Sequence, residues 1–246
     1  MINKIIIGFS ILVFSPETVW TDVPEYNIER TAEKIVIDGI LDEGDWVAAK
    51  SVGDFKFPWW KEGDKEQTEV KMLWDDTFLY VSFNCHDKYI WAEIYNTNAD
   101  TYKDDCVELF WNPNPEAGFM YNMFEINCIG NLLSVSNNFQ QSIYDRESRI
   151  LVPHIAQSIM GTVNNDEDVD SNWTIEMAFR FSDYTELYNG SIPVDGTMWR
   201  VALNRCGGKT NRQYSQWSPA QTPKPDLHSR KGKDFGKIFF RKDPVR

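Results

Sequence analysis

Short runs in which apolar and polar residues alternate recur along the whole chain, and they constrain the fold more than any other feature. Alternation at every second residue predicts strands with one buried face, because successive side chains of a strand point to opposite faces of a sheet. The clearest runs are 33–37, 70–74, 79–85, 106–111, 121–127, 132–135, 154–163, 173–181, 199–203 and 235–240. Turn-forming residues separate them, and helical periodicity is nearly absent. We therefore predict an all-β protein, a single-domain antiparallel β-sandwich with immunoglobulin-like or jelly-roll-like layers and short helical turns.

Composition indicates a globular protein with a binding face rich in rings. The chain has 246 residues, 42% of them hydrophobic, and no internal repeat. A formal net charge of -12 and a pI near 4.7 argue against nucleic acids and anionic membranes as partners. Ten Trp and ten Tyr are a surplus that favours ligand contact through rings. Adjacent Trp59 and Trp60 cannot both face inward, so one of them covers a neighbour or joins a ligand surface.

The first residues resemble an export signal. Residues 1–14 carry one Lys followed by an apolar run that is too short to span a bilayer. A buried first strand is the alternative. We expect residues 1–23 to be a leader and residues 24–246 to form the folded domain, secreted or periplasmic and without a membrane span.

The four cysteines are even in number, which an exported protein could use for disulfides. They are Cys85, Cys106, Cys128 and Cys206, and their spacing does not decide among three connectivities. No C-x-x-C pair occurs, which argues against a zinc site. Free buried thiols are the alternative, because the alternation turns Cys85 and Cys128 inward.

A β-hairpin spanning residues 100–127 carries the most informative polar pattern. One face of its two strands is apolar, and the other face carries Glu108, Glu125 and Asn127. If Asn112 pairs with Tyr121, Glu108 lies directly across from Glu125, where like charges destabilise a sheet. An Arg, a metal ion, a shifted pKa or a polyhydroxyl ligand could compensate.

The residues around this pair suit sugar recognition. Tyr102 offers a flat ring beside the carboxylates, and a sugar needs hydroxyl acceptors together with an apolar surface for its C–H face. Arg205, at the end of the strand at 199–203, could reach a carboxylate pair with its guanidinium fork. The alternative is a solvated outer face with no ligand.

An acidic loop at residues 164–170 offers oxygen ligands for calcium. It lacks the spacing of an EF-hand, so a solvated acidic turn is the favoured interpretation.

Five segments together resemble family 9 carbohydrate-binding modules, in particular the family 9-like proteins exported by bacteria within the DOMON-like sandwich group. These segments are IDGILDEGDW, LWDDTFLYVSF, YKDDCVELFWNP, FEINCIGNLL and the tail WSP…PDLHSRKGKDFGKIFF, and the resemblance spans residues 34–240. It implies a β-sandwich that binds a terminal sugar between two aromatic rings, and it implies a structural calcium ion with ligands that we cannot assign residue by residue.

The resemblance also implies roles for single residues. Tyr102 stands where the family carries its first Trp, and Glu108 matches the family's strand Glu. Glu125 and Asn127 match polar positions of the adjacent strand. The second ring should come from the tail loop, where this chain has Leu227 and His228.

We expect a monomeric, non-catalytic carbohydrate-binding module that works in polysaccharide catabolism with glycoside hydrolases as partners. Its predicted site consists of Tyr102, Glu108, Glu125, Asn127, Arg205 and His228. Three alternatives remain open. They are a glycoside hydrolase that uses Glu108 and Glu125, a haem-binding domain that uses Met120 or Met123 with His86, His154 or His228, and a structural sandwich without a small ligand.

Overall fold

Strands dominate the computed structural model, which describes residues 23–117, 120–138, 143–145, 152–183, 192–219, 222, 225, 227 and 234–246. Its named helices are short: α1 (Gly44–Ala48) and the 3-10 turns η1 (Thr101–Lys103) and η2 (Pro115–Ala117). The all-β prediction is confirmed. Among the described residues no helix is long and apolar enough to cross a bilayer.

The strands form one curled sheet in the order β7-β6-β5-β4-β10-β12-β1-β2-β3-β9-β8, with β11 paired to β10. Their bounds are β1 (Glu25–Arg30), β2 (Thr68–Trp74), β3 (Phe78–His86), β4 (Cys106–Asn112), β5 (Met120–Asn127), β6 (Leu132–Asn138), β7 (Ile143–Asp145), β8 (His154–Met160), β9 (Asn172–Arg180), β10 (Met198–Gly207), β11 (Gln213–Gln216) and β12 (Gly236–Pro244). The sheet is mixed rather than wholly antiparallel, because β1 runs parallel to both β12 and β2.

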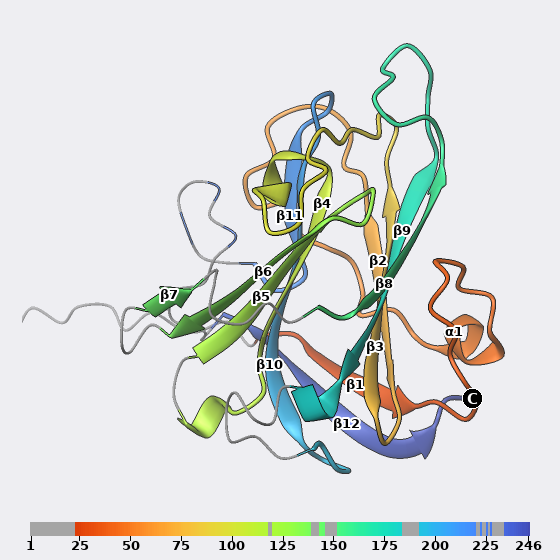
Figure 1. Ribbon diagram of the computed structural model, residues 1–246, viewed down its shortest axis with the longest axis vertical. Helices are drawn as coiled ribbons and strands as arrows, with labels where there is room; N and C mark the ends of the chain where they lie inside the picture. Colours follow the sequence, from red (N-terminus) through yellow and green to blue (C-terminus); the bar gives the residue numbers. More distant parts are fainter. Residues whose placement is uncertain are drawn as a thin grey trace, which may run out of the picture.

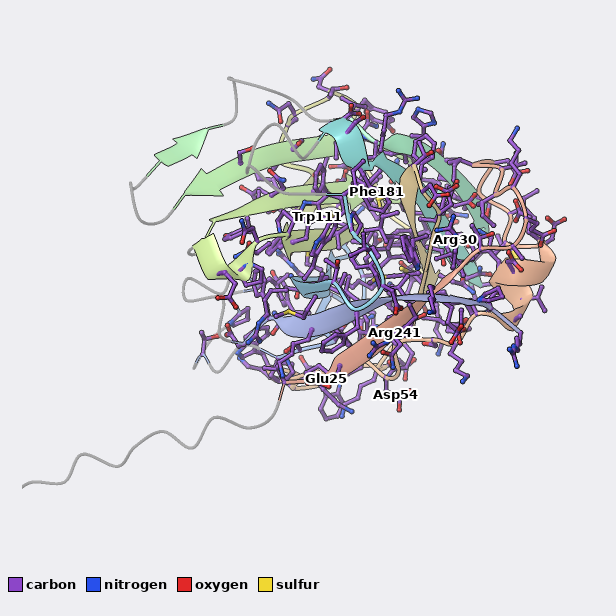
Figure 2. All side chains as sticks on the ribbon, turned by 90° about the horizontal axis from the view of Figure 1, so that it is seen from below. Glu25, Arg30, Asp54, Trp111, Phe181 and Arg241 are labelled. Atoms are coloured by element: carbon purple, nitrogen blue, oxygen red, sulfur yellow. The ribbon has the colours of Figure 1, made fainter. Side chains whose placement is uncertain are left out.

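Strand β10 joins the two layers of the sandwich. One of its edges pairs with β4, and the other edge pairs first with β12 and then with β11. The sheet folds over at this strand, so that β4–β6 face β2, β3 and β9 (Figure 1). Rings from the two layers meet in the main core, where the centroid of Trp111 on β4 lies 4.5 Å from that of Phe179 on β9. Figure 2 shows Trp111 among the densely packed interior side chains.

Residues 33–37, predicted as a strand, form no strand in the structure. Backbone N–H groups of this region donate to carboxylate side chains, where those of a strand would donate to a neighbouring strand. The Val36 N–H donates to Glu43 Oε1 at 2.8 Å, and the N–H groups of Asp38 and Gly39 donate to Glu176 Oε2 at 3.0 and 2.9 Å. The Trp46 indole N–H reaches the other oxygen of Glu176 at 2.9 Å. The carboxylate of Glu176 on β9 thus holds both the turn at Asp38 and Gly39 and the helix residue Trp46.

Gly39, in this turn, lies so close to the backbone of β8 that only glycine fits there. Gly39 has φ +84°, a left-handed conformation that L side chains rarely adopt, and a Cβ there would lie 2.6 Å from the backbone carbon of Gln157 on β8. Gly53 has a similar φ of +96° with open space around it. A side chain at Gly53 would meet backbone strain alone, whereas one at Gly39 would meet strain and a steric clash.

We predict that Gly39→Ala lowers the free energy of unfolding by about 3 kcal/mol, because strain and the clash with Gln157 act together. Gly53→Ala should cost about 1 kcal/mol through strain alone. Urea denaturation of both variants measures the difference. Equal losses would show that the contact between the turn and β8 contributes nothing.

Candidate functional site

A row of four polar side chains crosses the face of β5, β4, β10 and β11 that points away from the main core, here called the outer face. Glu125 lies opposite Glu108, Glu108 opposite Asn204, and Asn204 opposite Gln216. The predicted opposition of Glu108 and Glu125 is confirmed. Asn204 Nδ2 donates to Glu108 Oε2 at 3.0 Å, and Gln216 Nε2 donates to Asn204 Oδ1 at 3.0 Å. We call these four residues the polar row.

The polar row is buried, so the alternative of a solvated outer face is wrong. Glu108 and Glu125 are each only 2% exposed. Two clusters accompany the row on this face. One consists of Phe110, Tyr121, Met123, Leu133, Val135, Ala202 and Phe235, and the other of Cys106, Cys206 and Leu227 with Trp59 and Tyr214 packed against them. The polar row is therefore covered by side chains that pack on the outer face.

Residue Leu227 from the tail approaches the row directly. Its carbonyl oxygen accepts long hydrogen bonds from Asn204 Nδ2 and Gln216 Nε2, both at 3.4 Å. Leu227 itself is buried. The tail thus contributes an aliphatic side chain and a carbonyl to this face at the position that the family resemblance assigned to an aromatic ring.

Both carboxylate oxygens of Glu108 accept hydrogen bonds from β10. Asn204 donates to Oε2, and the Cys206 thiol donates to Oε1 at 3.3 Å. Charge-assisted acceptance of this kind offsets part of the cost of burying a carboxylate. The side chain of Glu108 is therefore held in one orientation by its neighbouring strand.

Tyr102 stands at the edge of the polar row and is 38% exposed. Its turn, η1, is fastened to β5 by the Thr101 hydroxyl, which donates to the Glu125 carbonyl at 3.0 Å, and to β10 by the Cys206 thiol, which donates to the Tyr102 carbonyl at 3.6 Å. Partial burial raises the pKa of Tyr102, and the negative charges of Asp100 and Glu125 raise it further. The structure thus places Tyr102 near Glu125, which in turn lies opposite Glu108.

Two further rings border the same face, and our sequence reasoning did not assign them to the site. Trp59 and Tyr214 are half-buried and pack against Cys106, Cys206 and Leu227. The Trp59 indole N–H donates to the Thr222 carbonyl at 3.0 Å. The neighbouring Trp60 is more exposed, so the adjacent pair divides between a covering ring and a surface ring as the sequence requires.

The sequence also missed Asn204 and Gln216. Asn204 could have been found, because it alternates with the inward-facing Val201 and Leu203 and so shares the face of Glu108. Gln216 lies on the four-residue strand β11, which gave no recognisable alternation.

Asn127, another predicted site residue, is wholly buried and supports a loop. Its Nδ2 donates to the Ile94 carbonyl and to Asp104 Oδ2, each at 2.8 Å, and its Oδ1 accepts the Asn131 N–H at 2.8 Å. These bonds use both N–H donors and one oxygen lone pair of the amide. Asn127 therefore shares the strand face of Glu125, but its side chain is held by Ile94 and Asp104 on the two sides of η1.

Arg205, also a predicted site residue, lies on the inner face of β10 and does not join the polar row. It reaches a different carboxylate pair, with NH2 2.9 Å from Asp87 Oδ2 and 3.9 Å from Glu66 Oε2. NH1 donates to the His86 carbonyl at 2.5 Å. The strand alternation explains this placement, because Arg205 follows Leu203 by two residues.

Burial raises the pKa of Glu66, and it raises that of the neighbouring Asp105 well above the ordinary value, with the nearby Asp87 charge adding to both shifts. The guanidinium of Arg205 opposes these shifts. Arg205 is thus the counter-charge of a buried acidic cluster.

The remaining predicted ligands are dispersed. His228 and the side chain of Met120 lie outside the described residues. Met123 is buried in the apolar cluster on the outer face, whereas His86 and His154 are exposed on β3 and β8. The described candidates Met123, His86 and His154 are therefore not brought together for haem.

No group of three or more His, Cys, Asp or Glu side chains arranged to hold a metal occurs in the described part of the chain. In the acidic loop, Asp170 accepts the N–H groups of Ile90 and Thr162, and Asn164 Oδ1 accepts that of Ala92. Asp170 and Asn164 therefore act as backbone caps in this loop.

Comparisons with known proteins identify a family and a shared fold. The family described as carbohydrate-binding family 9 matches residues 24–240. A proposed carbohydrate-binding protein from Bacteroides uniformis superposes with a TM-score of 0.69 at 18% identity, covering 88% of this chain and 98% of that chain.

A family 9 module from Caldicellulosiruptor kristjanssonii in complex with cellotriose superposes with a TM-score of 0.60 at 15% identity, covering 89% and 94% of the two chains. A family 9 module from the same organism with glucose gives 0.56 at 14% identity, covering 90% and 98%. No curated protein matches. At these identities the structural likenesses show a shared fold.

We predict that Arg205→Met lowers the free energy of unfolding by about 3–5 kcal/mol at pH 7, because it leaves buried carboxylates without a counter-charge. A buried carboxylate with a raised pKa disfavours folding as pH rises above the unfolded-state pKa, so the loss should shrink toward pH 5.

Urea denaturation at the two pH values measures this effect. Arg180→Met, at an exposed position on β9, is the matched control and should change stability by no more than about 0.5 kcal/mol. A stable Arg205→Met protein, or a loss independent of pH, would contradict a counter-charge role.

Proposed function

The chain belongs to carbohydrate-binding family 9, and from this premise we propose that it is a non-catalytic module that binds a sugar or a glycan chain end at the outer face. The observation that carries the proposal is the partly exposed ring of Tyr102 beside the Glu108 and Glu125 pair. Family 9 structures with cellotriose and glucose support a saccharide as the ligand class.

The recognition mode follows from the chemistry of these groups. The Tyr102 ring offers an apolar surface to the C–H face of a pyranose, and carboxylate oxygens accept hydrogen bonds from hydroxyls. Glu108 and Glu125 are each 2% exposed, so they reach a ligand only when the residues that cover their face, Trp59 and Leu227, are displaced. Charge-assisted hydrogen bonds are stronger than neutral ones, so the carboxylates would then orient the sugar while the ring supplies apolar contact.

We assign the second ring of the site to Trp59 in place of the tail loop. Leu227 is buried where an aromatic residue was expected, whereas Trp59 is half-buried over the same cluster and is held by its bond to the Thr222 carbonyl. An indole also presents a larger surface than the phenol of Tyr214. Arg205 and Asn127 have structural roles in this proposal.

We further propose that Glu108 and Glu125 do not act as a hydrolytic pair. Directly opposed strand residues lie about 5 Å apart, near the carboxylate separation of retaining glycosidases, so distance alone does not decide. However, both oxygens of Glu108 already accept hydrogen bonds from β10, which hold the carboxylate in one orientation among protein partners.

The leader-like residues 1–14 support export to the periplasm or the medium, where a sugar-binding protein would meet polysaccharides alongside glycoside hydrolases.

We predict that a glycan-array screen yields a ligand and that Tyr102→Ala weakens its binding at least about tenfold, because a central stacking ring contributes more than about 1.4 kcal/mol. Isothermal titration calorimetry measures the affinity. Tyr95→Ala removes a more exposed tyrosine, on the loop before η1, and should bind as the wild type does. No hit on the array, or equal affinity of all three proteins, would overturn the assigned site.

We predict that Glu108→Gln weakens sugar binding about tenfold while preserving the fold, because a neutral amide accepts hydrogen bonds less strongly than a carboxylate. Glu69→Gln, at an exposed position on β2, is the control and should leave affinity unchanged. Neither the wild type nor either variant should release the chromophore from an aryl glycoside. Wild-type turnover that Glu108→Gln abolishes would replace the binding proposal with the hydrolase alternative.

A further inference from the structure

Two of the four buried thiols lie directly opposite each other on the outer face. Cys106 on β4 is the register partner of Cys206 on β10, and both are buried in the cluster with Leu227. Register and packing thus bring the two side chains together across one strand pair.

This position satisfies the backbone geometry of a disulfide. Directly opposed residues of antiparallel strands have Cα atoms about 4.5 or 5.5 Å apart. Both spacings fall within the range of about 4.4–6.8 Å that a disulfide spans. No large movement of β4 or β10 is needed to link the two sulfur atoms.

The other two cysteines lie in the main core, on the opposite side of the sheet from the outer face. Cys85 accepts a long hydrogen bond from the Thr68 hydroxyl at 3.8 Å, and the Cys128 thiol donates to the Trp91 carbonyl at 3.8 Å. The sequence allows three ways of pairing the four cysteines. The structure brings Cys106 and Cys206 together on the outer face, away from Cys85 and Cys128.

We propose that Cys106 and Cys206 form a disulfide across β4 and β10 when the chain folds in the presence of a small-molecule disulfide, and that Cys85 and Cys128 remain thiols. Two S–H bonds and the S–S bond of the small molecule break, and one protein S–S bond forms. The two electrons and two protons pass to the small molecule, which leaves as two thiols.

Because both thiols are buried in the folded protein, we expect the disulfide to form during folding. Desolvation raises the pKa of the Cys106 thiol to about 11, and the thiolate is the species that attacks a disulfide. The folded, reduced pair is therefore slow to react. In an oxidising compartment the bond forms before β4 and β10 are fully covered.

The disulfide would also alter the sugar site, a consequence that rests on the proposed function. In the thiol form, the single S–H of Cys206 lies within reach of two acceptors, Glu108 Oε1 at 3.3 Å and the Tyr102 carbonyl at 3.6 Å. Disulfide formation removes this S–H donor and so changes how β10 holds Glu108 and η1.

Peptide mapping tests the proposal without any sugar. The chain is unfolded with dithiothreitol, refolded in a reduced and oxidised glutathione buffer, alkylated in denaturant and digested without reduction. We expect one linked peptide pair containing Cys106 and Cys206, with Cys85 and Cys128 alkylated. Four alkylated cysteines, or any other pairing, would overturn the proposal.

If refolding is inefficient, the same peptide mapping is applied to protein recovered from a bacterial periplasm. The linked Cys106–Cys206 peptide pair would support the proposal there too, and any other result would overturn it.

Urea denaturation gives a second readout. Oxidation should raise the unfolding midpoint of the wild type and of Cys128→Ala, because the bond closes a long loop. It should leave the midpoint of the Cys106→Ala/Cys206→Ala double variant unchanged. A midpoint shift in the double variant would also overturn the proposal.

Discussion

The pairing of β10 with strands on both of its edges is the constraint on which the rest of the molecule depends. Because β10 meets β4 on one edge and β12 and β11 on the other, one curled sheet can serve as both layers of a sandwich. Alternation along β10 then fixes two environments at once. Leu203 and Arg205 point into the space between the layers, and Asn204 and Cys206 point to the outer face.

The outer face shows how a sheet can bury like charges opposite each other. Glu108 and Glu125 would destabilise the hairpin if they faced each other without other partners. Donors on β10 offset this cost, since Asn204 and Cys206 both reach Glu108. A fold selected for stability alone would place apolar residues here, as the adjacent cluster around Phe110 does. Retaining the carboxylates next to a partly exposed tyrosine is consistent with selection for ligand binding.

Periodicity predicted the strands and the register of the central hairpin, because alternation and turn residues are local properties. It failed where side chains replaced the ladder, as at residues 33–37, and where strands were short, as in β11. The burial of Glu108 and Glu125 could not be predicted, because Trp59 and Leu227 reach their face from distant parts of the sequence. The placement of Arg205 could have been predicted, since the spacing from Leu203 assigns it to the inner face.

Sugar binding at the outer face can be tested by mapping amide chemical shifts by NMR during titration with a glycan that binds. We predict shifts concentrated in η1, β4, the second half of β10 and β11, with β8 and β9 unchanged. Shifts concentrated on β8 and β9, in the opposite layer, would contradict it.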